Sequence, residues 1–244
     1  MSKYALVLLS GGMDSAVALF WAAHSKQYER IDALTIDYGQ SSRQELTSAN
    51  YVWNEYWRRY SYPGTHMTLS YDLFPHSDSS ILRGTQRYIN QYDTVEQAIA
   101  GTRTDKSYIP MRNAVLASIA SSFLLTQNPK GGDIVMGIRG RTGGRGFPDC
   151  THGFAVWMTE GLSQGAGVRI KIIDPLNGGS IPTRKDTLEL ARAIPGCFEA
   201  LRYTSSCFKG LVPPCGHCLP CLRRAQAFQE LGRPDPILAK VYNV

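Results

Sequence analysis

The sequence predicts an α/β fold in which a five-stranded parallel sheet is covered by helices on both faces. Short apolar runs alternate with longer helix-like segments from residue 4 to residue 194, and this alternation is typical of doubly wound parallel sheets. The first apolar run leads directly into the glycine-rich stretch SGGMDS at residues 10–15. With 244 residues, of which 43% are hydrophobic, the chain is long enough for one large domain, with or without a small appendage.

Five apolar runs are predicted to be the strands. Each run is short and is bounded by glycine, proline or polar turn residues, which favours buried strands over helices. The predicted strands are residues 4–9, 31–36, 66–69, 133–137 and 168–173.

The longer segments between these runs are predicted to be helices. The segment RNAVLASIASSFLL, which follows Pro110, is strongly apolar. Thr183 is a suitable N-cap for another helix, with Asp186 at the N3 position as the reciprocal cap. The predicted helices cover residues 15–24, 44–60, 112–125, 153–164, 184–194 and 219–231.

Three segments are expected to meet at one edge of this sheet. The glycine-rich stretch, the turn DYGQ at residues 37–40 and the segment after Gly137 all follow predicted strands. Ligands in open parallel sheets bind beyond the carboxyl ends of the strands, so these segments mark the expected site. Residues 70–108 form a long polar connection, which we interpret as a lid insertion over that site.

The glycine-rich stretch, here called the glycine loop (residues 10–15), has the properties of a phosphate-binding loop. It follows a strand and opens a helix, so that free amides and the positive end of the helix dipole face an anion. Its glycines permit close backbone approach, and Ser10 and Ser15 add hydroxyl donors. A tight turn without a ligand is the simpler interpretation, but a turn does not require this frame of serine and aspartate.

The glycine loop lacks the lysine of a Walker A motif, which contacts the β- and γ-phosphates. Asp14 stands instead at a place where direct contact with a phosphate would be repulsive. Two roles fit this carboxylate: it holds a Mg²⁺ ion that lies between it and the phosphates, or it caps the following helix. We therefore expect the loop to hold pyrophosphate while the α-phosphate is attacked, rather than to hydrolyse the γ-phosphate.

The charge and hydropathy of the chain bear on the ligands that it binds and on its location in the cell. The net charge of +6 suits an anionic ligand, but it fits an ordinary basic surface equally well. No apolar run reaches the roughly 18 residues that a membrane span needs, and residues 4–9 are too short for a signal peptide. We therefore expect a cytoplasmic protein.

Four of the six cysteines lie in the C-terminal stretch CFKGLVPPCGHCLPC. Their spacing, C-x7-C-x2-C-x2-C, suits tetrahedral coordination of Zn²⁺ by four thiolates, and an iron–sulfur cluster is the lesser alternative. His217 lies between two of these cysteines, but the two-residue spacings favour the thiols. The expected metal ligands are Cys207, Cys215, Cys218 and Cys221.

The glycine loop resembles the pyrophosphate loop of the N-type ATP pyrophosphatases, also called PP-loop enzymes. Together with the cysteines, it resembles the 7-cyano-7-deazaguanine synthase family of queuosine biosynthesis, and the similarity extends over nearly the whole chain. The further matching segments are DYGQ at residues 37–40 with Glu45, IPMRN at 109–113, FPDC at 147–150, PL at 175–176, and the helix near Lys185.

The resemblance implies an ATP-dependent ligase. In that family ATP adenylates the carboxylate of 7-carboxy-7-deazaguanine, ammonia gives the amide, and a second activation followed by loss of AMP gives the nitrile. Arg112 or Lys185 would neutralise the charge that develops at the α-phosphate, and Asp14 is the third expected catalytic residue. The expected small molecules are therefore ATP, 7-carboxy-7-deazaguanine and ammonia, with Mg²⁺ and Zn²⁺ as cofactors.

The same resemblance assigns the binding residues. The ATP site is expected at Leu8, Leu9, Ser10, Gly11, Gly12, Met13, Asp14, Ser15, Asp37 and Gln40. The deazaguanine site is expected at Arg112, Asn113, Arg139, Arg145, Phe147 and Asp149. Asp149 is the expected partner of the guanine-like N–H edge.

The chain departs from the family pattern in the segment that is expected to line the substrate pocket. Residues 139–151 read RGRTGGRGFPDCT, where the family usually has D-x-S-G-Y-P-D-C-R. The upstream aspartate and serine are missing, phenylalanine replaces tyrosine, and Thr151 replaces arginine. Ser42 stands where the family usually has histidine. Residues 139–145 carry three arginines, which suit a more anionic ligand.

Three interpretations remain open, the first two because of these departures and the third because the chain is basic and carries the cysteine cluster. In the first, other contacts compensate and the nitrile is formed. In the second, the chain is a paralogue that stops at the amide or couples the deazaguanine carboxylate to an amine of a macromolecular partner. In the third, it is a PP-loop tRNA-modifying enzyme or a zinc nucleic-acid-binding protein, although no row of basic and aromatic residues adjoins the cysteines.

The expected organisation is a PP-loop ATP-binding α/β domain at residues 1–200, followed by a small zinc-binding helical region at residues 201–244. A homodimer is an open alternative to a monomer, whereas a nucleic-acid or protein partner is not favoured. Cys150 and Cys197 are interpreted as buried packing thiols rather than as nucleophiles.

Overall fold

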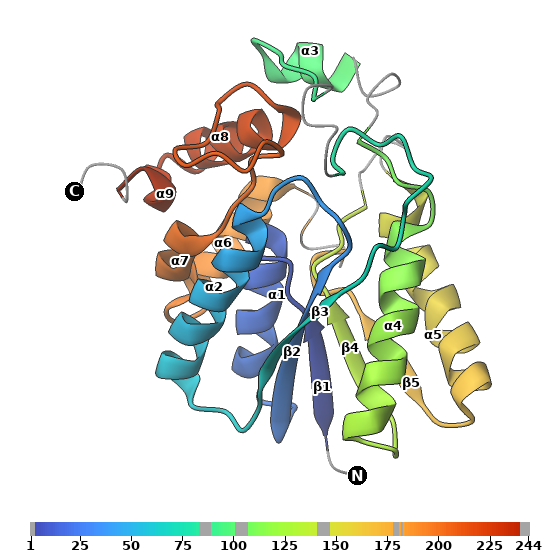
Figure 1. Ribbon diagram of the computed structural model, residues 1–244. Helices are drawn as coiled ribbons and strands as arrows, with labels where there is room; N and C mark the ends of the chain where they lie inside the picture. The colour runs from blue at the N-terminus through green and yellow to red at the C-terminus, as the bar shows by residue number, and fades with distance from the viewer. Residues whose placement is uncertain are drawn as a thin grey trace.

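The computed structural model describes residues 3–82, 89–100, 107–140, 147–177, 181 and 183–239. Within these ranges a five-stranded sheet lies between two layers of helices (Figure 1). The strands are β1 (Tyr4–Leu8), β2 (Arg30–Asp37), β3 (His66–Ser70), β4 (Gly132–Met136) and β5 (Ile170–Ile173). They pair in the order β3-β2-β1-β4-β5, and every pairing is parallel. The predicted α/β fold with a doubly wound parallel sheet is confirmed.

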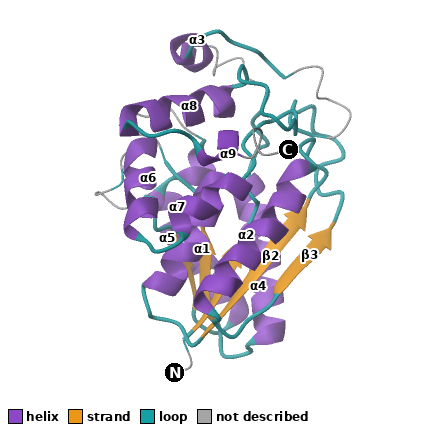
Figure 2. Ribbon diagram, turned by 90° about the vertical axis from the view of Figure 1, so that its left-hand side faces the viewer, coloured by secondary structure: helices purple, strands orange, loops and turns teal. Residues whose placement is uncertain are grey.

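Helices cover both faces of the sheet, and others lie beyond the carboxyl ends of the strands (Figures 1 and 2). On one face lie α1 (Met13–His24), α2 (Gln44–Tyr60), α6 (Arg184–Ala193) and α7 (Cys197–Ala200). On the other lie α4 (Arg112–Gln127) and α5 (His152–Ala166). The remaining helical segments are α3 (Val95–Ala100), α8 (Leu219–Leu231), α9 (Pro236–Ala239) and the 3₁₀ turns η3 (Pro148–Cys150) and η4 (Leu201–Tyr203). Across the described part of the chain, no helix is both long enough and apolar enough to cross a membrane.

The sheet separates two apolar cores. Along β1, Ala5 and Val7 face the core formed with α1 and α2, whereas Leu6 faces the core formed with α4 and α5. All three side chains are buried. A strand that is covered on both faces needs an apolar residue at each position, and this requirement explains the unbroken apolar run of β1.

The first helix begins earlier than the sequence predicted. It starts at Met13, because Gly12 already has the extended conformation of an N-cap, with φ −79° and ψ 165°. Asp14 therefore lies inside the first turn of α1, and the N-cap of this helix forms no side-chain hydrogen bond. The capping interpretation of Asp14 is wrong. The capping box predicted for α6 is present, since Thr183 and Asp186 each accept a hydrogen bond from the other's backbone amide.

The described parts of residues 70–108 contact the C-terminal region. The amide of Tyr92 donates to the carbonyl of His217 at 2.9 Å, and Ile89 packs against the cysteines of that region. α8 in turn joins the core of α1 through Phe228. A lid movement of residues 70–108 and a domain boundary after residue 200 remain predictions.

Gly11 lies where the glycine loop crosses the backbone of α2. Its φ of +83° is strained for other residues, and a Cβ at this position would overlap the carbonyl oxygen of Glu45 and lie 2.8 Å from the amide nitrogen of Ala49. Both conformation and space therefore require glycine here. The amide of Ser205 donates to the carbonyl of Gly11 at 2.9 Å, which ties the C-terminal region to the same loop.

We expect Gly11→Ala to destabilise the protein by about 2–4 kcal/mol, because the added methyl group must displace the backbone of α2. The matched control is Gly161→Ala in α5, where a Cβ meets nothing within 4 Å. Alanine favours a helix over glycine by about 1 kcal/mol, so this control should be neutral or stabilising. Urea unfolding followed by circular dichroism compares the variants. Equal midpoints for Gly11→Ala and the parent would contradict the close packing of the loop on α2.

Candidate functional site

A cavity of about 890 Å³ lies at the carboxyl ends of β1, β2 and β4. β1 lies in the middle of the sheet, with β2 and β3 on one side and β4 and β5 on the other. The strand order therefore reverses beside β1. Such a switch point is where open parallel sheets bind ligands. The volume lies in the upper part of the range for small-molecule sites, and it is large enough for a nucleotide together with a small heterocycle.

The glycine loop forms the floor of this cavity and is braced by its own serines. The hydroxyls of Ser10 and Ser15 lie 3.0 Å apart, and the Ser15 hydroxyl accepts from the amide of Ser10 at 3.2 Å and donates to the carbonyl of Gly12 at 3.0 Å. The two predicted donors therefore also hold the loop in shape. The cavity is lined by all the predicted ATP-site residues between 8 and 15 except Gly11, which packs against α2.

Asp14 faces the cavity from the first turn of α1 and forms an ion pair with Arg184, the first residue of α6. The distance from Arg184 Nη1 to Asp14 Oδ2 is 3.3 Å. The other oxygen, Oδ1, is buried and has no hydrogen-bond partner among the described residues. A buried carboxylate oxygen without a partner is unfavourable, and carboxylate oxygens are the ligands that Mg²⁺ prefers. The residues present therefore fit a Mg²⁺ ion at Asp14.

Lys185, the predicted catalytic lysine, does not line this cavity. Its Nζ lies 3.6 Å from Glu189 Oε1, one turn further along α6, and its side chain is 42% exposed. Arg184 lines the cavity instead. Sequence reasoning missed Arg184, although an arginine directly after the N-cap of a helix at this edge of the sheet was a signal for it. The catalytic role of Lys185 remains a prediction.

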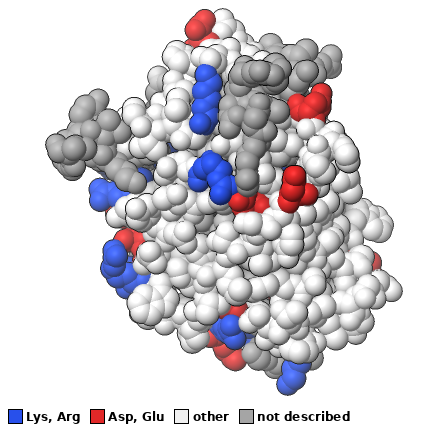
Figure 3. Space-filling model, in the orientation of Figure 1, with Lys and Arg blue, Asp and Glu red and all other residues white. Residues whose placement is uncertain are grey.

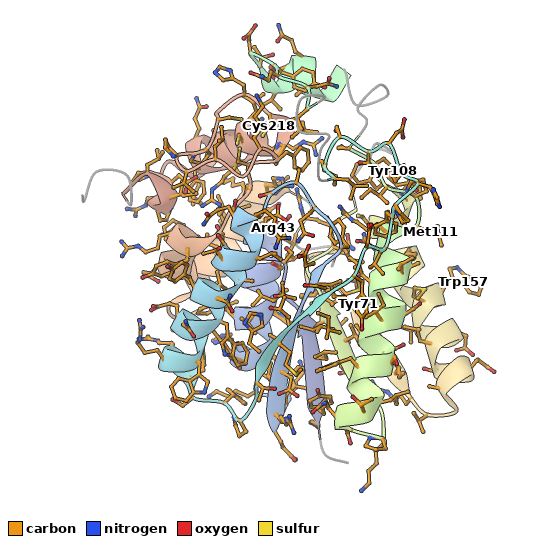
Figure 4. The ribbon with its side chains drawn as sticks, in the orientation of Figure 1. Arg43, Tyr71, Tyr108, Met111, Trp157 and Cys218 are labelled. Atoms are coloured by element: carbon orange, nitrogen blue, oxygen red, sulfur yellow. The ribbon has the colours of Figure 1, made fainter. Side chains whose placement is uncertain are left out.

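In the turn after β2, Asp37 has a structural role and Gln40 lines the cavity. Asp37 is buried, accepts from the amide of Gly39 at 3.2 Å and pairs with Arg43, which Figure 4 labels near the upper end of α2. Asp37 is not among the lining residues. Gln40 lines the cavity, and its Oε1 accepts from the amide of Tyr38 at 2.9 Å. Asp37 therefore shapes the turn that presents Gln40.

Arg112, the first residue of α4, stands in the opposite wall of the cavity. Its Nη1 lies 3.4 Å from the hydroxyl of Tyr38, and its guanidinium carbon is 5.9 Å from the centre of that ring. Glu45 lines the same cavity. Burial raises the pKa of the Glu45 carboxyl to about 7, although the charge of Arg112 opposes this shift. Near neutral pH, Glu45 is therefore present in both protonation states beside a permanent cation.

Asn113 and Asp149 fasten the start of α4 to η3. The Asn113 amide donates to Asp149 Oδ2 at 3.0 Å, and its Nδ2 donates to the carbonyl of Asp149 at 2.9 Å. Asn113 lines the cavity, whereas Asp149 is buried and does not. In this structure the Asp149 carboxylate supports the amino end of α4. Its pairing with a guanine-like edge remains a prediction.

Cys150 lines the cavity beside Asn113, whose Nδ2 lies 3.2 Å from the sulfur. Burial raises the pKa of the Cys150 thiol to about 11. The thiol is therefore neutral at physiological pH and a poor nucleophile, which favours the packing interpretation. Cys197 is fully buried in the core beside α1, and burial raises its pKa as well.

Part of the segment that departs from the family pattern is described. The ring of Phe147 stacks on Tyr108 with 5.0 Å between the ring centres, and Figure 4 labels Tyr108 and Met111 near the start of α4. Phe147 and Arg139 both line the cavity. Arg145 lies outside the described residues, so its predicted role in binding has no structural counterpart here.

The four cysteines lie together beyond the carboxyl ends of the strands, where Figure 4 labels Cys218 at the start of α8. All four sulfur atoms lie within 4.8 Å of one another. The sulfur of Cys221 is 3.3 Å from that of Cys218 and 4.0 Å from that of Cys215. Four bonds of about 2.3 Å to a tetrahedral Zn²⁺ place sulfur atoms about 3.8 Å apart. The cysteines therefore fit a single ion, whereas thiolates around a multi-iron cluster would stand further apart.

The segments beside the cysteines form one wall of the cavity. Phe208 follows Cys207, and its carbonyl accepts a hydrogen bond from the hydroxyl of Ser41 at 3.0 Å. Sequence reasoning missed this wall, although its members lie next to the predicted metal ligands in the sequence. The lining residues of this wall are Ser205, Ser206, Phe208, Leu219, Pro220 and Arg223.

The face of the molecule shown in Figure 3 carries scattered charges. Among the residues that this view describes, Lys and Arg side chains stand singly or in small groups with neutral surface between them. Nucleic-acid-binding proteins usually gather their basic residues into a patch or stripe. This face therefore gives no support to a nucleic-acid interface.

Known proteins resemble this chain over almost its full length. The family model described as Queuosine biosynthesis protein QueC matches residues 4–232. A 7-cyano-7-deazaguanine synthase of Laribacter hongkongensis is 30% identical over 242 residues, which cover 99% of this chain and 97% of the relative. Another, of Picrophilus torridus, is 32% identical over 240 residues and covers 96% and 90%.

Among solved structures, a 4-thiouridine synthetase in complex with RNA and bound ATP aligns with 98% of this chain and 53% of its own, at 17% identity and a TM-score of 0.49. A likeness of this degree says nothing about ligands. The family model, by contrast, covers most of the chain, and its range of residues 4–232 includes the motifs at residues 10–15 and 37–40. The chain belongs to the QueC family of queuosine biosynthesis proteins.

Proposed function

We propose that this chain is an ATP-dependent carbon–nitrogen ligase that converts 7-carboxy-7-deazaguanine and ammonia into 7-cyano-7-deazaguanine, with release of AMP and pyrophosphate. The observation that supports this proposal most is the shared cavity. The glycine loop lines one side of it, and Arg112, Asn113 and Phe147 line the other. The name of the relatives, 7-cyano-7-deazaguanine synthase, indicates the product.

In the first half-reaction the carboxylate of the substrate attacks the α-phosphorus of ATP, and the bond to pyrophosphate breaks. The glycine loop and the amino end of α1 bind the phosphates. Asp14 would hold a Mg²⁺ ion at this loop, and the ion would supply positive charge that offsets the charge of the phosphates. Arg112 faces the loop across the cavity, where its guanidinium balances the charge that develops on the attacked phosphate.

In the second half-reaction ammonia attacks the carbonyl carbon of the acyl adenylate, and AMP leaves. The carboxyl of Glu45 lines the cavity, and its pKa of about 7 suits proton transfer from the attacking ammonia. A second ATP then activates the amide oxygen, and loss of AMP and two protons leaves the nitrile. Two ATP molecules are consumed for the two oxygen atoms that the carboxylate loses.

A second candidate function rests on the departures at residues 139–151. Here the chain activates the same acid but stops at the amide, or transfers the acyl group to an amine of a macromolecular partner. The arginines of this segment suit a more anionic acceptor. The loop that would bind ATP keeps the family pattern, so the two candidates share the activation step and differ in the later steps.

The proposed organisation reflects these roles. Residues 1–200 form the ATP-binding domain, residues 70–108 its lid, and residues 201–244 a zinc-binding region in a cytoplasmic enzyme. Four thiolates leave no open position for water on a zinc ion. Zinc therefore has a structural role, which is to hold the cavity wall near Ser205 and Pro220.

Asp14→Asn should lower pyrophosphate release by at least about 100-fold, because the neutral amide no longer attracts the cation that shields the phosphates. The thermal midpoint should change little, since the side chain faces a cavity. The measurement is pyrophosphate release with ATP, Mg²⁺ and 7-carboxy-7-deazaguanine, with Glu29→Gln on the exposed turn before β2, at the end of the sheet away from the cavity, as the control. Normal turnover by Asp14→Asn would rule out the pyrophosphate-loop assignment.

Elemental analysis should find one zinc ion per chain. Cys218→Ser should lose this zinc and melt at a lower temperature, because binding to a structural site of this kind contributes on the order of 10 kcal/mol to folding. Cys150→Ser, whose thiol lies outside the cysteine cluster, should keep its zinc. A parent protein without zinc, or a Cys218→Ser variant that melts like the parent, would count decisively against the site.

The product distinguishes the two candidate functions. We expect single-turnover mass spectrometry of the parent to show 7-cyano-7-deazaguanine, and accumulation of the amide or of a conjugate would support the second candidate instead. If Arg145 contacts the substrate, Arg145→Ala should slow product formation, since an unpaired polar ligand edge costs about 1–3 kcal/mol. Equal rates in parent and variant would remove any special role for Arg145, and a parent that forms no adenylate would overturn both candidates.

A further inference from the structure

The ion pair between Asp14 and Arg184 joins α1 and α6 beside the glycine loop. Asp14 comes from the first turn of α1 and Arg184 from the first turn of α6, and both side chains line the cavity. They are partly exposed, at 20% and 25%. The backbone of Arg184 is held in place by the capping box of α6, in which Thr183 and Asp186 bond to each other.

This ion pair leaves both partners incompletely bonded. The single contact is 3.3 Å long, which is weak for an arginine–carboxylate bond. Asp14 Oδ1 and Arg184 Nε are both buried, and no hydrogen bond reaches either of them from the described residues. By contrast, the buried Arg224 donates to both oxygens of Asp235, at 2.6 and 2.8 Å. The geometry suits a contact that is exchanged for another one.

The carboxylate and the guanidinium of this ion pair attract ligands of opposite charge. A metal cation at Asp14 is repelled by the guanidinium 3.3 Å from the carboxylate, whereas phosphate oxygens at the loop are attracted by it. A nucleotide that carries its own Mg²⁺ satisfies both groups at once. Asp14 would then hold the metal in place of the guanidinium, and Arg184 would be free to contact the phosphates.

We propose that Arg184 is a charge-exchange residue, which neutralises Asp14 in the nucleotide-free protein and moves to the phosphate oxygens when Mg²⁺–ATP enters. The inference rests on the proposed function, because it takes ATP as the ligand of this loop. It assigns to Arg184 the control of metal entry: Asp14 binds the cation well when phosphate arrives with it and poorly when the cation is alone. Lys185 is not suited to this role, since its ammonium lies near Glu189 and outside the cavity.

If the charge exchange occurs, removing the guanidinium should raise the affinity for a metal ion alone and lower the affinity for Mg²⁺–ATP. In Arg184→Gln, Mn²⁺ alone should bind about two- to fivefold more tightly, because its competitor on Asp14 is gone. The same variant should bind Mg²⁺–ATP about 10- to 100-fold more weakly, because a charged hydrogen bond to phosphate is lost. If Arg184 only stabilised the fold, its replacement would change both affinities in the same direction or would change neither of them.

The experiment uses zinc-replete full-length protein without the deazaguanine acid, so that no reaction occurs. Electron paramagnetic resonance measures the binding of Mn²⁺ alone, and calorimetry measures the binding of Mg²⁺–ATP. Arg184→Lys keeps a positive charge and should bind Mg²⁺–ATP with an affinity between those of the parent and Arg184→Gln. Arg192→Gln changes an exposed arginine of the same helix and should match the parent in both measurements. Thermal melts confirm that each variant is folded.

The results separate this inference from the function on which it rests. Opposite shifts in Arg184→Gln, together with loss of Mn²⁺ binding in Asp14→Asn, establish the exchange. Unchanged or parallel shifts in Arg184→Gln overturn it, even when the parent binds Mg²⁺–ATP and the proposed function stands. A parent that fails to bind Mg²⁺–ATP overturns the proposed function itself, whatever the manganese titrations show.

Discussion

The arrangement of the site depends on the contact between Gly11 and the backbone of α2. The glycine loop can cross α2 at this distance only because Gly11 has no side chain and adopts a positive φ. The same residue accepts a hydrogen bond from Ser205, which belongs to the C-terminal wall of the cavity. One close approach therefore sets the relative positions of the loop, of α2 with Glu45, and of the C-terminal wall.

The sequence predicted well those features that are periodic or local. Apolar runs and their spacing indicated five parallel strands, and the strand ends indicated where the glycine loop and Gln40 would meet. The cysteine spacing likewise predicted four sulfur atoms in one place. These features depend on chain topology and on short-range geometry, so neither side-chain directions nor long-range packing had to be known.

Side-chain direction was the part that the sequence did not determine. Neighbouring residues on a helix point about 100° apart, so the rotation of α6 decides whether Arg184 or Lys185 meets the loop. That rotation is set by packing against α1, α7 and α8. Asp149 is a second example. Its carboxylate is occupied by the backbone of α4, a contact across 36 residues that no local pattern indicates.

The two sides of the cavity come from different parts of the chain, and this division bears on how the family pattern has changed. The glycine loop, Asp14 and Glu45 belong to the layer of α1 and α2, whereas Arg112 and Phe147 belong to α4 and the segment before η3. The departures from the family lie mainly on the second side. On the proposed function, the first side binds the phosphates of ATP, whereas the second side holds the acid and places Arg112 beside the attacked phosphate. A change in the second side can then alter the product while the first side, fixed by Gly11, keeps its geometry.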